Sequence, residues 1–373
     1  MRIGFIEDTP LHGGTQIWVS EATRYFLDKG EEVVILCPAD TWMQKQIDGT
    51  GARVFTYDWD GVVGEGEDSR KIWIDALGNC DVALCTVHPP RDGFHCSVFA
   101  ARCIDEGGLR TCLVPKTGTI VPEYKREYYE SGRDINYAVI AITGFTRDYL
   151  IDEYGLPADK VTLVYQGTEI DRFQPSVEGR AESLKRYALP DNSFPVLGCI
   201  GSFEERKGLN VLIETVRQLA DGPLPQVHAM LVGDGPDEAI LKQQVNELAI
   251  ENHVSFFPFT RQPDIVFERL DITVLSSLYK EGLPNVLLES MAMSVPVVAS
   301  RIAGVPEIVI EAETGYMVEP GDAKDLATGI EKLAADANAC RKMGENGRAL
   351  VVRSHDKHVQ FDAFLEYFRE IAQ

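Results

Sequence analysis

Residues Glu281–Ser300 read EGLPNVLLESMAMSVPVVAS. Gly282 and Pro284 predict a turn, and proline is tolerated in the first turn of a helix. Asn285–Met293 predicts a helix, which Pro296 prevents from continuing, and the run PVVAS that follows predicts a buried strand. The segment therefore predicts a turn, a helix and a strand in succession, which is the repeating pattern of a parallel α/β sheet.

The same alternation of apolar runs and helical stretches extends over the whole chain, which predicts parallel sheets covered on both faces. The apolar runs are RIGFIE, EVVILC, ARVFTY, DVALCTV, RTCLVP, YAVIAIT, VTLVYQG, FPVLGCIGS, QVHAMLVGDG, HVSFF, DITVLSS, PVVAS and GYMVE. Between VTLVYQG and FPVLGCIGS, residues 167–195 are rich in charge, glycine, proline and asparagine, which is typical of a linker. We therefore expect an α/β protein with two domains, residues 1–168 and 169–354. The apolar residues of 355–373 have helical spacing, and we expect this helix to dock back onto the first domain.

Length and composition set limits on the class of protein. A chain of 373 residues favours two domains, and the fractions of hydrophobic and charged residues, 45% and 25%, are ordinary for a soluble protein. The net charge of −22 argues against nucleic acids and anionic membranes as partners. No apolar run is long enough to span a bilayer, and the first residues pass directly into a strand pattern without an export signal. The eight cysteines are scattered, which favours a reducing, cytoplasmic location.

Two turns have the composition of anion sites. Gly13 and Gly14 stand where the first strand turns into the first helix, so backbone N–H groups there can approach an anion, although glycine pairs also serve as plain turns. The pattern is not the GxGxxG of dinucleotide-binding proteins. In GSFEERKG, Arg206 and Lys207 precede a predicted helix whose amino end itself favours anions. A bound anion would remove this conflict, whereas the alternative is a pair of solvated surface charges.

Glu281 and Glu289 belong to the opening segment and are separated by about two helical turns. The two carboxylates are too far apart to meet, but each can accept hydrogen bonds from a different part of one extended ligand. The free N–H groups at the start of the helix can bind a phosphate between them. A sugar, a diphosphate and a ribose would fit this order. The alternative for Glu289 is a solvated helix face.

Taken together, these segments resemble the retaining GT-B glycosyltransferases of family 4. The resemblance covers nearly the whole chain through HGGTQ, VYQGTEIDRFQP, GSFEERKG, LVGDGP, EGLPNVLLESMAMSVPVVAS and AGVPEIV. It implies a GT-B fold, in which two Rossmann-like domains with parallel sheets face each other across a cleft. The first domain is expected to bind the acceptor and the second the nucleotide-sugar donor.

The resemblance also implies roles for individual residues. Glu281 would hold hydroxyls of the donor sugar, Glu289 would bind the ribose, and Lys207 would neutralise the diphosphate, which Gly14 would approach from the opposite domain. The candidate catalytic residues are Glu281, Lys207, Arg206 and His88. The candidate donor-binding residues are Gly13, Gly14, Gly201, Ser202, Gly282, Leu283, Pro284, Asn285, Val286, Leu287 and Glu289.

Two of the departures from the family pattern concern the expected site. Ser202 stands where the family often has the second cation aimed at the diphosphate, and Arg206 is the candidate to replace it. Where many members carry a histidine close to the donor sugar, this chain has Lys116 or Thr117 after the strand RTCLVP. His88 and His95 are the alternative histidines.

The implied activity is the transfer of a sugar from a nucleotide diphosphate-sugar, with UDP- and GDP-sugars as the first candidates, to the hydroxyl of an unidentified small molecule or glycan. The product would be an α-glycoside, formed without a cofactor or a metal. Asp58 and Asp60 form the one Asp-x-Asp spacing that warrants inspection as a metal site. The alternatives are another GT-B activity, such as an epimerase, and a non-catalytic nucleotide-sugar binding protein. A homo-oligomer is compatible with the sequence.

Overall fold

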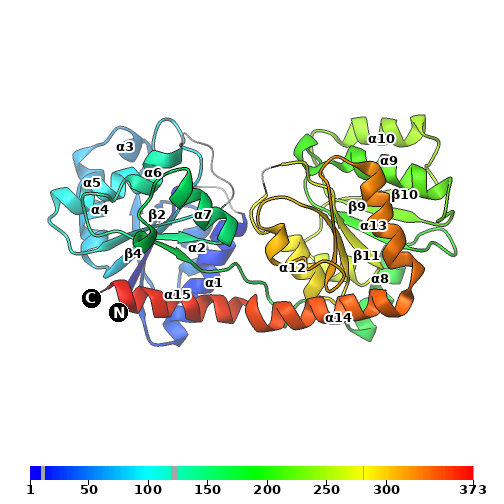
Figure 1. Cartoon of the computed structure of the whole chain (residues 1–373). Coiled ribbons are helices and arrows are strands. Elements are labelled where there is room, and N and C mark those ends of the chain that lie inside the picture. The colour runs from blue at the N-terminus through cyan, green and yellow to red at the C-terminus, as the bar shows by residue number, and fades with distance from the viewer. Residues whose placement is uncertain (10–12, 119–124, 280, 373) are drawn as a thin grey trace. The chain divides into compact units, whose positions relative to one another are not determined.

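The computed structural model describes residues 1–9, 13–118, 125–279 and 281–372, and the chain divides into two compact units (Figure 1). The first unit comprises Met1–Tyr165 together with Gln360–Gln373, and the second comprises Gln166–Val359. Each unit is built on one parallel sheet with helices on both faces, as the alternating pattern predicts. Because the chain returns to the first unit at its carboxyl end, that unit is discontinuous in sequence.

The sheet of the first unit has the strand order β3-β2-β1-β4-β5-β6-β7, and all neighbouring strands are parallel. Its strands are β1 (Arg2–Ile6), β2 (Glu32–Pro38), β3 (Arg53–Tyr57), β4 (Val82–Thr86), β5 (Cys112–Lys116), β6 (Val139–Ala141) and β7 (Val161–Leu163). The strand order reverses beside β1, between β1 and β4. In open α/β sheets, ligands bind beyond the carboxyl ends of the strands near such a reversal.

The helices of the first unit cover two hydrophobic cores, one on each face of the sheet. They are α1 (Gly14–Asp28), α2 (Trp42–Ile47), α3 (Trp59–Val63), α4 (Glu67–Gly78), α5 (Cys96–Glu106), α6 (Arg126–Glu130) and α7 (Gly144–Asp152), with a 3-10 turn at Ala158–Lys160. Successive residues of a strand contribute to opposite cores: Phe5 of β1 packs with α1, and Ile6 packs with Trp73 of α4. Burial on both faces explains why these strands read as continuous apolar runs.

The last helix, α15 (Lys357–Ile371), packs on α1 from Gln360 onward. The rings of Phe364 and Trp18 lie 5.0 Å apart, and the indole N–H of Trp18 donates a hydrogen bond of 3.0 Å to Oε1 of Gln360. Phe361 and Phe368 complete the same core. The helical spacing of apolar residues near the chain end is thus explained by burial against the first unit.

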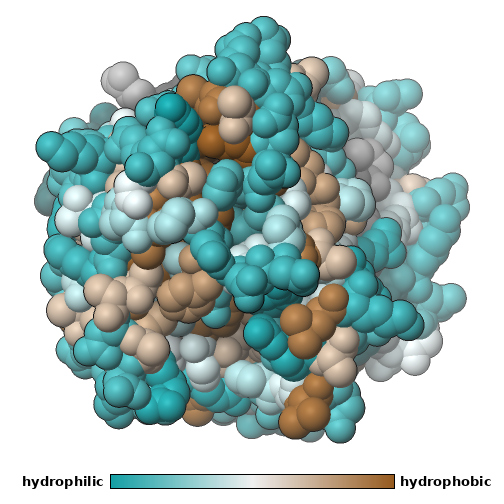
Figure 2. All heavy atoms as spheres, turned by 90° about the vertical axis from the view of Figure 1, so that its right-hand side faces the viewer, coloured by the Kyte–Doolittle hydropathy of each residue, from teal (hydrophilic) through white to brown (hydrophobic). Residues whose placement is uncertain are grey.

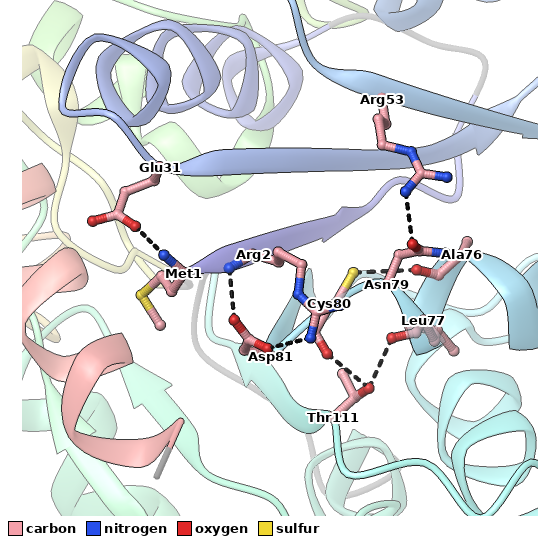
Figure 3. A network of polar contacts seen from close by, with 10 residues as sticks. All are labelled: Met1, Arg2, Glu31, Arg53, Ala76, Leu77, Asn79, Cys80, Asp81 and Thr111. Atoms are coloured by element: carbon pink, nitrogen blue, oxygen red, sulfur yellow. Dashed lines mark hydrogen bonds and ion pairs between the residues drawn. The ribbon is translucent and has the colours of Figure 1, made fainter.

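A polar network fastens the amino ends of the strands in the first unit (Figure 3). The backbone N–H and the guanidinium of Arg2 both donate to the carboxylate of Asp81, each at 2.7 Å. The hydroxyl of Thr111 donates to the carbonyl oxygens of Leu77 and Cys80 at 2.8 and 3.1 Å. Burial raises the pKa of Asp81, but the hydrogen bonds and charge of Arg2 outweigh that effect and hold it below its ordinary value. This end of the sheet is therefore tied together by internal partners.

The sheet of the second unit has the order β10-β9-β8-β11-β12-β13 and is also parallel. Its strands are β8 (Val196–Ile200), β9 (His228–Val232), β10 (Val254–Phe257), β11 (Ile272–Leu275), β12 (Val297–Ser300) and β13 (Gly315–Val318). Its helices are α8 (Val177–Arg186), α9 (Leu209–Ala220), α10 (Glu238–Glu247), α11 (Pro263–Phe267), α12 (Asn285–Ala292), α13 (Ala323–Ala335) and α14 (Ala337–Ser354), with 3-10 turns at Glu205–Lys207 and Val305–Glu307. The order reverses between β8 and β11.

The linker expected over residues 167–195 contains a helix that the composition did not predict. In α8 the hydroxyl of Ser176 caps the amino end by accepting a bond of 2.9 Å from Gly179 N. The guanidinium of Arg186 donates to Gln262, which precedes α11. Tertiary contacts of this kind outweigh a composition that by itself favours an irregular segment.

The surface shown in Figure 2 is mainly hydrophilic, with smaller hydrophobic patches between the hydrophilic areas. Among the exposed large apolar side chains of the second unit, Ile240 and Phe259 are each about two-thirds exposed. Scattered residues of this kind are normal on protein surfaces. Of the helices in the described residues, none is both long enough and apolar enough to cross a membrane.

Candidate donor site and strand-end pockets

The turn that carries Arg206 and Lys207 is fixed by backbone contacts to the segment after β11. Ser276 Oγ donates to the carbonyl of Lys207 at 2.9 Å, and Leu278 N donates to the carbonyl of Arg206 at 2.8 Å. Gly208 has φ of +61°, and a Cβ there would lie 2.1 Å from the carbonyl oxygen of Ser276. Only glycine fits this close approach, and it ends the 3-10 turn before α9 begins at Leu209. The helix predicted to follow Arg206 and Lys207 is therefore α9.

This turn places cations on Glu281. Lys207 Nζ lies 2.6 Å from Glu281 Oε1, and Nη1 of Arg206 lies 3.6 Å from the same oxygen. Ser277 Oγ donates to it at 2.7 Å. The side chains of Glu281 and Lys207 are only 8% and 17% exposed, so this is a largely desolvated ion pair. Among the described residues, these polar contacts all go to Oε1, which leaves Oε2 of Glu281 available to a ligand hydroxyl.

The turn after Glu281 leads into α12, whose first residue is Asn285 and whose last is Ala292. Pro284 is the residue before the helix and supplies no side-chain cap. Helix starts without a cap keep backbone N–H groups free for an anion. The turn of AGVPEIV lies against this segment, since Gly304 N donates to the carbonyl of Gly282 at 3.2 Å. The helix ends one residue earlier than the predicted Met293.

The apolar residues of the predicted donor set point into the core. Leu283 and Leu287 are 4% and 0% exposed, so they offer a ligand only their backbone. Val286 is partly exposed, and the exposed amide of Asn285 forms a hydrogen bond with the amide of Gln166. The pairing of Asn285, a predicted donor-binding residue, with Gln166 is a feature that the sequence did not reveal.

Glu289 lies within α12 on a partly buried face. Burial raises the pKa of its carboxyl to about 7, an effect that the positive charges of Arg172 and Lys357 only partly oppose. No hydrogen bond to this carboxyl is found among the described residues. A partly buried carboxyl without a partner has the capacity to accept hydrogen bonds from a ligand.

Ser202 belongs to a chain of polar contacts that includes Arg206. The hydroxyl of Ser202 and then the guanidinium of Arg206 hold the pKa of Glu204 below its ordinary value, and Arg206 Nε lies 2.8 Å from Glu204 Oε2. Arg206 is thereby shared between Glu204 and Glu281. Gly201 lies at the close approach of two turns, because a Cβ on Gly233 would lie 1.9 Å from the carbonyl oxygen of Gly201.

In the first unit, Gly13 and Gly14 line a pocket of about 440 Å³ at the carboxyl ends of β1 and β4. We call it the Gly14 pocket; its lining residues are Asp8, Thr9, Gly13, Gly14, Thr15, Gln16, His88, Pro89, Pro90 and Arg91. α1 starts at Gly14 without a side-chain cap, and a Cβ on Gly14 would meet nothing within 4 Å. His12, the first residue of the predicted HGGTQ turn, lies outside the described residues, as do the two residues before it.

The candidate histidines have different surroundings. His88 lines the Gly14 pocket, and burial, followed by the charges of Lys116, Lys125 and Arg91, lowers its pKa to about 4. It is therefore neutral at ordinary pH. His95 instead caps α5: its Nδ1 accepts from Ser97 N at 3.2 Å, its Nε2 lies 3.1 Å from the carbonyl oxygen of His88, and its ring stacks on Tyr128. These contacts give His95 a structural role.

Lys116 and Thr117 are buried at the end of β5. The ammonium of Lys116 lies 4.6 Å from the ring centroid of Trp18, and burial lowers its pKa to about 8. Glu7, at the end of β1, has its pKa raised to about 8 by burial and accepts a bond of 2.8 Å from Gln16. The hydroxyl of Thr117 accepts from Ile142 N at 3.1 Å and so belongs to the internal structure.

Sequence reasoning missed Ser277 in the second unit and Asp8 and Arg91 in the first. The serine stands four residues before Glu281 in SSLYKEG, and this spacing was the available signal. Asp8 and Arg91 come from separate loops and reach one pocket through the strand order of the sheet. No local pattern distinguishes them from ordinary loop residues.

Comparison with known proteins finds relatives for part of this chain. Residues 181–350 match the family model described as glycosyl transferases group 1. A GDP-mannose-dependent alpha-(1-6)-phosphatidylinositol monomannoside mannosyltransferase of Mycolicibacterium smegmatis is 30% identical over 238 residues, which are 62% of this chain and 61% of that protein. The lipopolysaccharide core biosynthesis glycosyltransferase LpsE of Rhizobium meliloti is 34% identical over 189 residues, or 50% and 54%. The chain thus spans a little over half the length of these relatives.

Solved structures resemble the whole chain. Anabaena Alr3699/HepE in complex with UDP has a TM-score of 0.85 at 20% identity, and covers 99% of this chain and 100% of that one. A glycosyltransferase from Rickettsia africae has a TM-score of 0.84 at 19% identity, with 100% and 98% covered. The chain therefore has the GT-B fold of two Rossmann-like units with parallel sheets. Within that fold, residues 181–350 of the second unit match the glycosyl transferases group 1 model.

Proposed function

We propose that this protein is a retaining glycosyltransferase of family 4, which transfers a sugar from a nucleotide diphosphate-sugar to an acceptor hydroxyl and forms an α-glycoside. The observation that carries the proposal is the arrangement around Glu281. Lys207, Arg206 and Ser277 converge on one oxygen of this carboxylate, immediately before a helix with an uncapped amino end. A carboxylate that can accept hydrogen bonds, two cations and free backbone N–H groups thus lie together in the second unit, which contains the match to the family model.

In the proposed complex, Glu281 accepts hydrogen bonds from hydroxyls of the donor sugar, and Lys207 and the start of α12 bind the diphosphate. Glu289 accepts from the ribose hydroxyls. Each group fits its role: Glu281 keeps one oxygen uncommitted among the described residues, and Glu289 has no internal hydrogen-bond partner there. Fixed cations and N–H groups in a poorly hydrated site stabilise charge on a departing phosphate more strongly than water does.

The chemical step follows from these roles. The bond between the anomeric carbon and the diphosphate oxygen breaks, and the acceptor oxygen forms a new bond to that carbon on the same face. The acceptor proton passes to the departing phosphate oxygen, so no strong enzymic base is required. A neutral His88 with a pKa of about 4 and a buried Lys116 are compatible with this route.

The donor is proposed to be a UDP- or GDP-sugar. HepE, which resembles this chain in fold, is described in complex with UDP, and the mycobacterial mannosyltransferase is described as GDP-mannose-dependent. We further propose that transfer needs no metal, because Lys207, Arg206 and the start of α12 supply the positive charge that a metal would provide.

The first test is calorimetric titration of the protein with UDP, GDP and ADP, with and without a chelator. We expect one nucleotide to bind selectively, with the same affinity after chelation, and Lys207→Ala to weaken it. Lys324→Ala, which removes an exposed lysine elsewhere in the same unit, is the control. If none of the three nucleotides binds, the proposed donor site is wrong.

Product analysis then separates the proposed activity from its alternatives. The donor is the nucleotide diphosphate-sugar whose nucleotide binds, and it is tested with a panel of acceptors. Transfer gives the free nucleotide and an α-glycoside. An isomerised donor would indicate an epimerase, and binding without turnover would indicate a non-catalytic protein. A β-linked product would contradict retention.

A further inference from the structure

A second pocket lies at the carboxyl ends of β2 and β3 in the first unit, beside the Gly14 pocket. Its volume is about 630 Å³, and we call it the Trp59 pocket. It is lined by Pro38, Ala39, Asp40, Thr41, Tyr57, Asp58, Trp59, Arg91 and Asp92. A volume of this size accommodates a ligand of one or two sugar rings.

Some lining groups already have internal partners. The hydroxyl of Tyr57 donates to the carbonyl of Glu7 at 2.7 Å, and the hydroxyl of Thr41 donates to the carbonyl of Pro38 at 2.9 Å. The hydroxyls of these two side chains are therefore already committed to internal partners. Ligand recognition in the pocket must therefore come from other side chains.

The remaining polar groups have unused capacity. Asp58 Oδ2 accepts from Gly61 N at 2.8 Å, which leaves its other oxygen uncommitted. The side chains of Asp40, Asp92 and Arg91 make no hydrogen bond or ion pair with other described residues. Asp40 and Asp92 have φ of +59° and +50°, in a region that aspartate occupies more readily than most residues. Three carboxylates and one guanidinium thus line the pocket, with a negative balance.

The pocket also contains an aromatic side chain in a fixed position. The ring of Trp59 meets that of Phe94 edge-on, with centroids 5.4 Å apart and planes at 80°. Phe94 in turn packs on the fully buried Trp73. An anchored indole beside hydrogen-bond acceptors is a combination that suits a sugar ring, whose C–H face packs on the aromatic ring while its hydroxyls donate to carboxylates.

Arg91 connects the two pockets. It lies after β4, where its backbone N–H and carbonyl exchange hydrogen bonds of 3.0 and 2.7 Å with Phe94, and it lines both the Trp59 pocket and the Gly14 pocket. In the sheet order β3-β2-β1-β4, this turn reaches past the end of β1 toward β2 and β3. A ligand in the Trp59 pocket therefore lies next to the Gly14 pocket of the same unit.

We propose that the Trp59 pocket binds the acceptor, and that this acceptor is a neutral or amino-bearing sugar rather than a phosphorylated or carboxylated one. The inference rests on the proposed function. The negative balance of Asp40, Asp58, Asp92 and Arg91 attracts hydroxyl and ammonium donors and repels anionic groups. Trp59 supplies the apolar contact that holds the ring.

The test is saturation-transfer NMR of the full chain with three probes: methyl glucoside, methyl glucosaminide and glucose phosphate. We expect the neutral and amino glycosides to bind, with the phosphate at least ~10-fold weaker. Trp59→Ala and Asp58→Asn are expected to weaken glycoside binding ~10-fold. Asp58→Asn keeps an oxygen to cap Gly61, so it remains informative if Trp59→Ala disturbs folding. Asp60→Asn, two positions away and outside the pocket lining, is the matched control.

Failure of this inference is distinguishable from failure of the proposed function. Nucleotide titration of the same variants is expected to give wild-type affinity, because the donor segment lies in the other unit. If the wild type binds a nucleotide, three results would overturn the acceptor assignment alone. They are no binding of the glycosides, unchanged glycoside binding in both Trp59→Ala and Asp58→Asn, and a preference for glucose phosphate. Absence of nucleotide binding in the wild type would overturn the donor proposal. The glycoside measurements would still show whether the Trp59 pocket binds a sugar.

Discussion

The candidate ligand-binding features of both units lie at the same structural place, the carboxyl ends of a parallel sheet, but the two units assemble them differently. In the second unit, Ser277, Glu281 and α12 follow one strand, β11, in a single run of sequence, and Arg206 and Lys207 come from the turn before α9. In the first unit, the two pockets draw on the loops after β1, β2, β3 and β4.

This difference determines which parts of the candidate site can be recognised from sequence. A contiguous segment is read directly from sequence, and residues 181–350 indeed match the family model. The pockets of the first unit have no such signature. The pKa values of the buried groups around them depend on neighbours that no motif describes. We expect donor-segment variants to affect nucleotide chemistry, and first-unit variants to affect acceptor binding and stability.

The largest expected effect is on turnover in Glu281→Gln. Glutamine keeps the shape of the side chain but loses the charge that holds Lys207, so we expect turnover to fall ~100-fold or more. Steady-state rates with the preferred donor measure this. Glu313→Gln, at an exposed position of the same unit, should retain wild-type turnover, and a fully active Glu281→Gln would contradict the proposed role.

Next in size is the loss of nucleotide affinity in Lys207→Ala. Removing a charge-assisted contact to a diphosphate is expected to cost ~2 kcal/mol, or ~30-fold in Kd. Calorimetry measures the change, with Lys324→Ala as the control. An unchanged Kd would mean that Lys207 serves only the ion pair with Glu281.

A smaller effect is expected on the pH dependence of binding. Because burial raises the pKa of Glu289 to about 7, its carboxylate form, the better acceptor, gains population as pH rises through that value. Nucleotide affinity of the wild type should increase up to ~10-fold between about pH 6 and about pH 8. Glu289→Gln should bind more weakly and without this slope; a slope that persists in the variant would assign it to another group.

The smallest effect on ligand binding is expected from Glu7→Gln, which instead alters stability. Burial raises the folded-state pKa of Glu7 from 4.5 to about 8, so the native state holds a proton that the unfolded state has released between these values. Native stability is therefore favoured at low pH and is lost as pH rises through this window.

Chemical denaturation at several pH values tests this effect. The free energy of unfolding of the wild type should decline more steeply toward about pH 8 than that of Glu7→Gln, by ~1 kcal/mol or more. Glu32→Gln, an exposed glutamate of β2, should follow the wild type, as should the nucleotide affinity of all three proteins. Parallel curves for wild type and Glu7→Gln would show that Glu7 does not titrate in this range.

By itself, the sequence determined the α/β class and the parallel sheets, and it predicted the donor segment with Glu281 and Glu289. It could do so because a strand buried on both faces must be apolar, and because turn, helix and strand follow one another within a few residues. Local chemistry also marked Arg206 and Lys207, since cations before a helix start are unusual.

The tertiary structure alone decided which separate segments meet. It joined Lys207 to Glu281, turned His95 into a helix cap, and brought Arg91 beside Trp59 and Asp58. It also formed α8 where the composition favoured a linker. These outcomes depend on strand order and on backbone approaches between residues far apart in the chain, and such contacts leave no periodic pattern in the sequence.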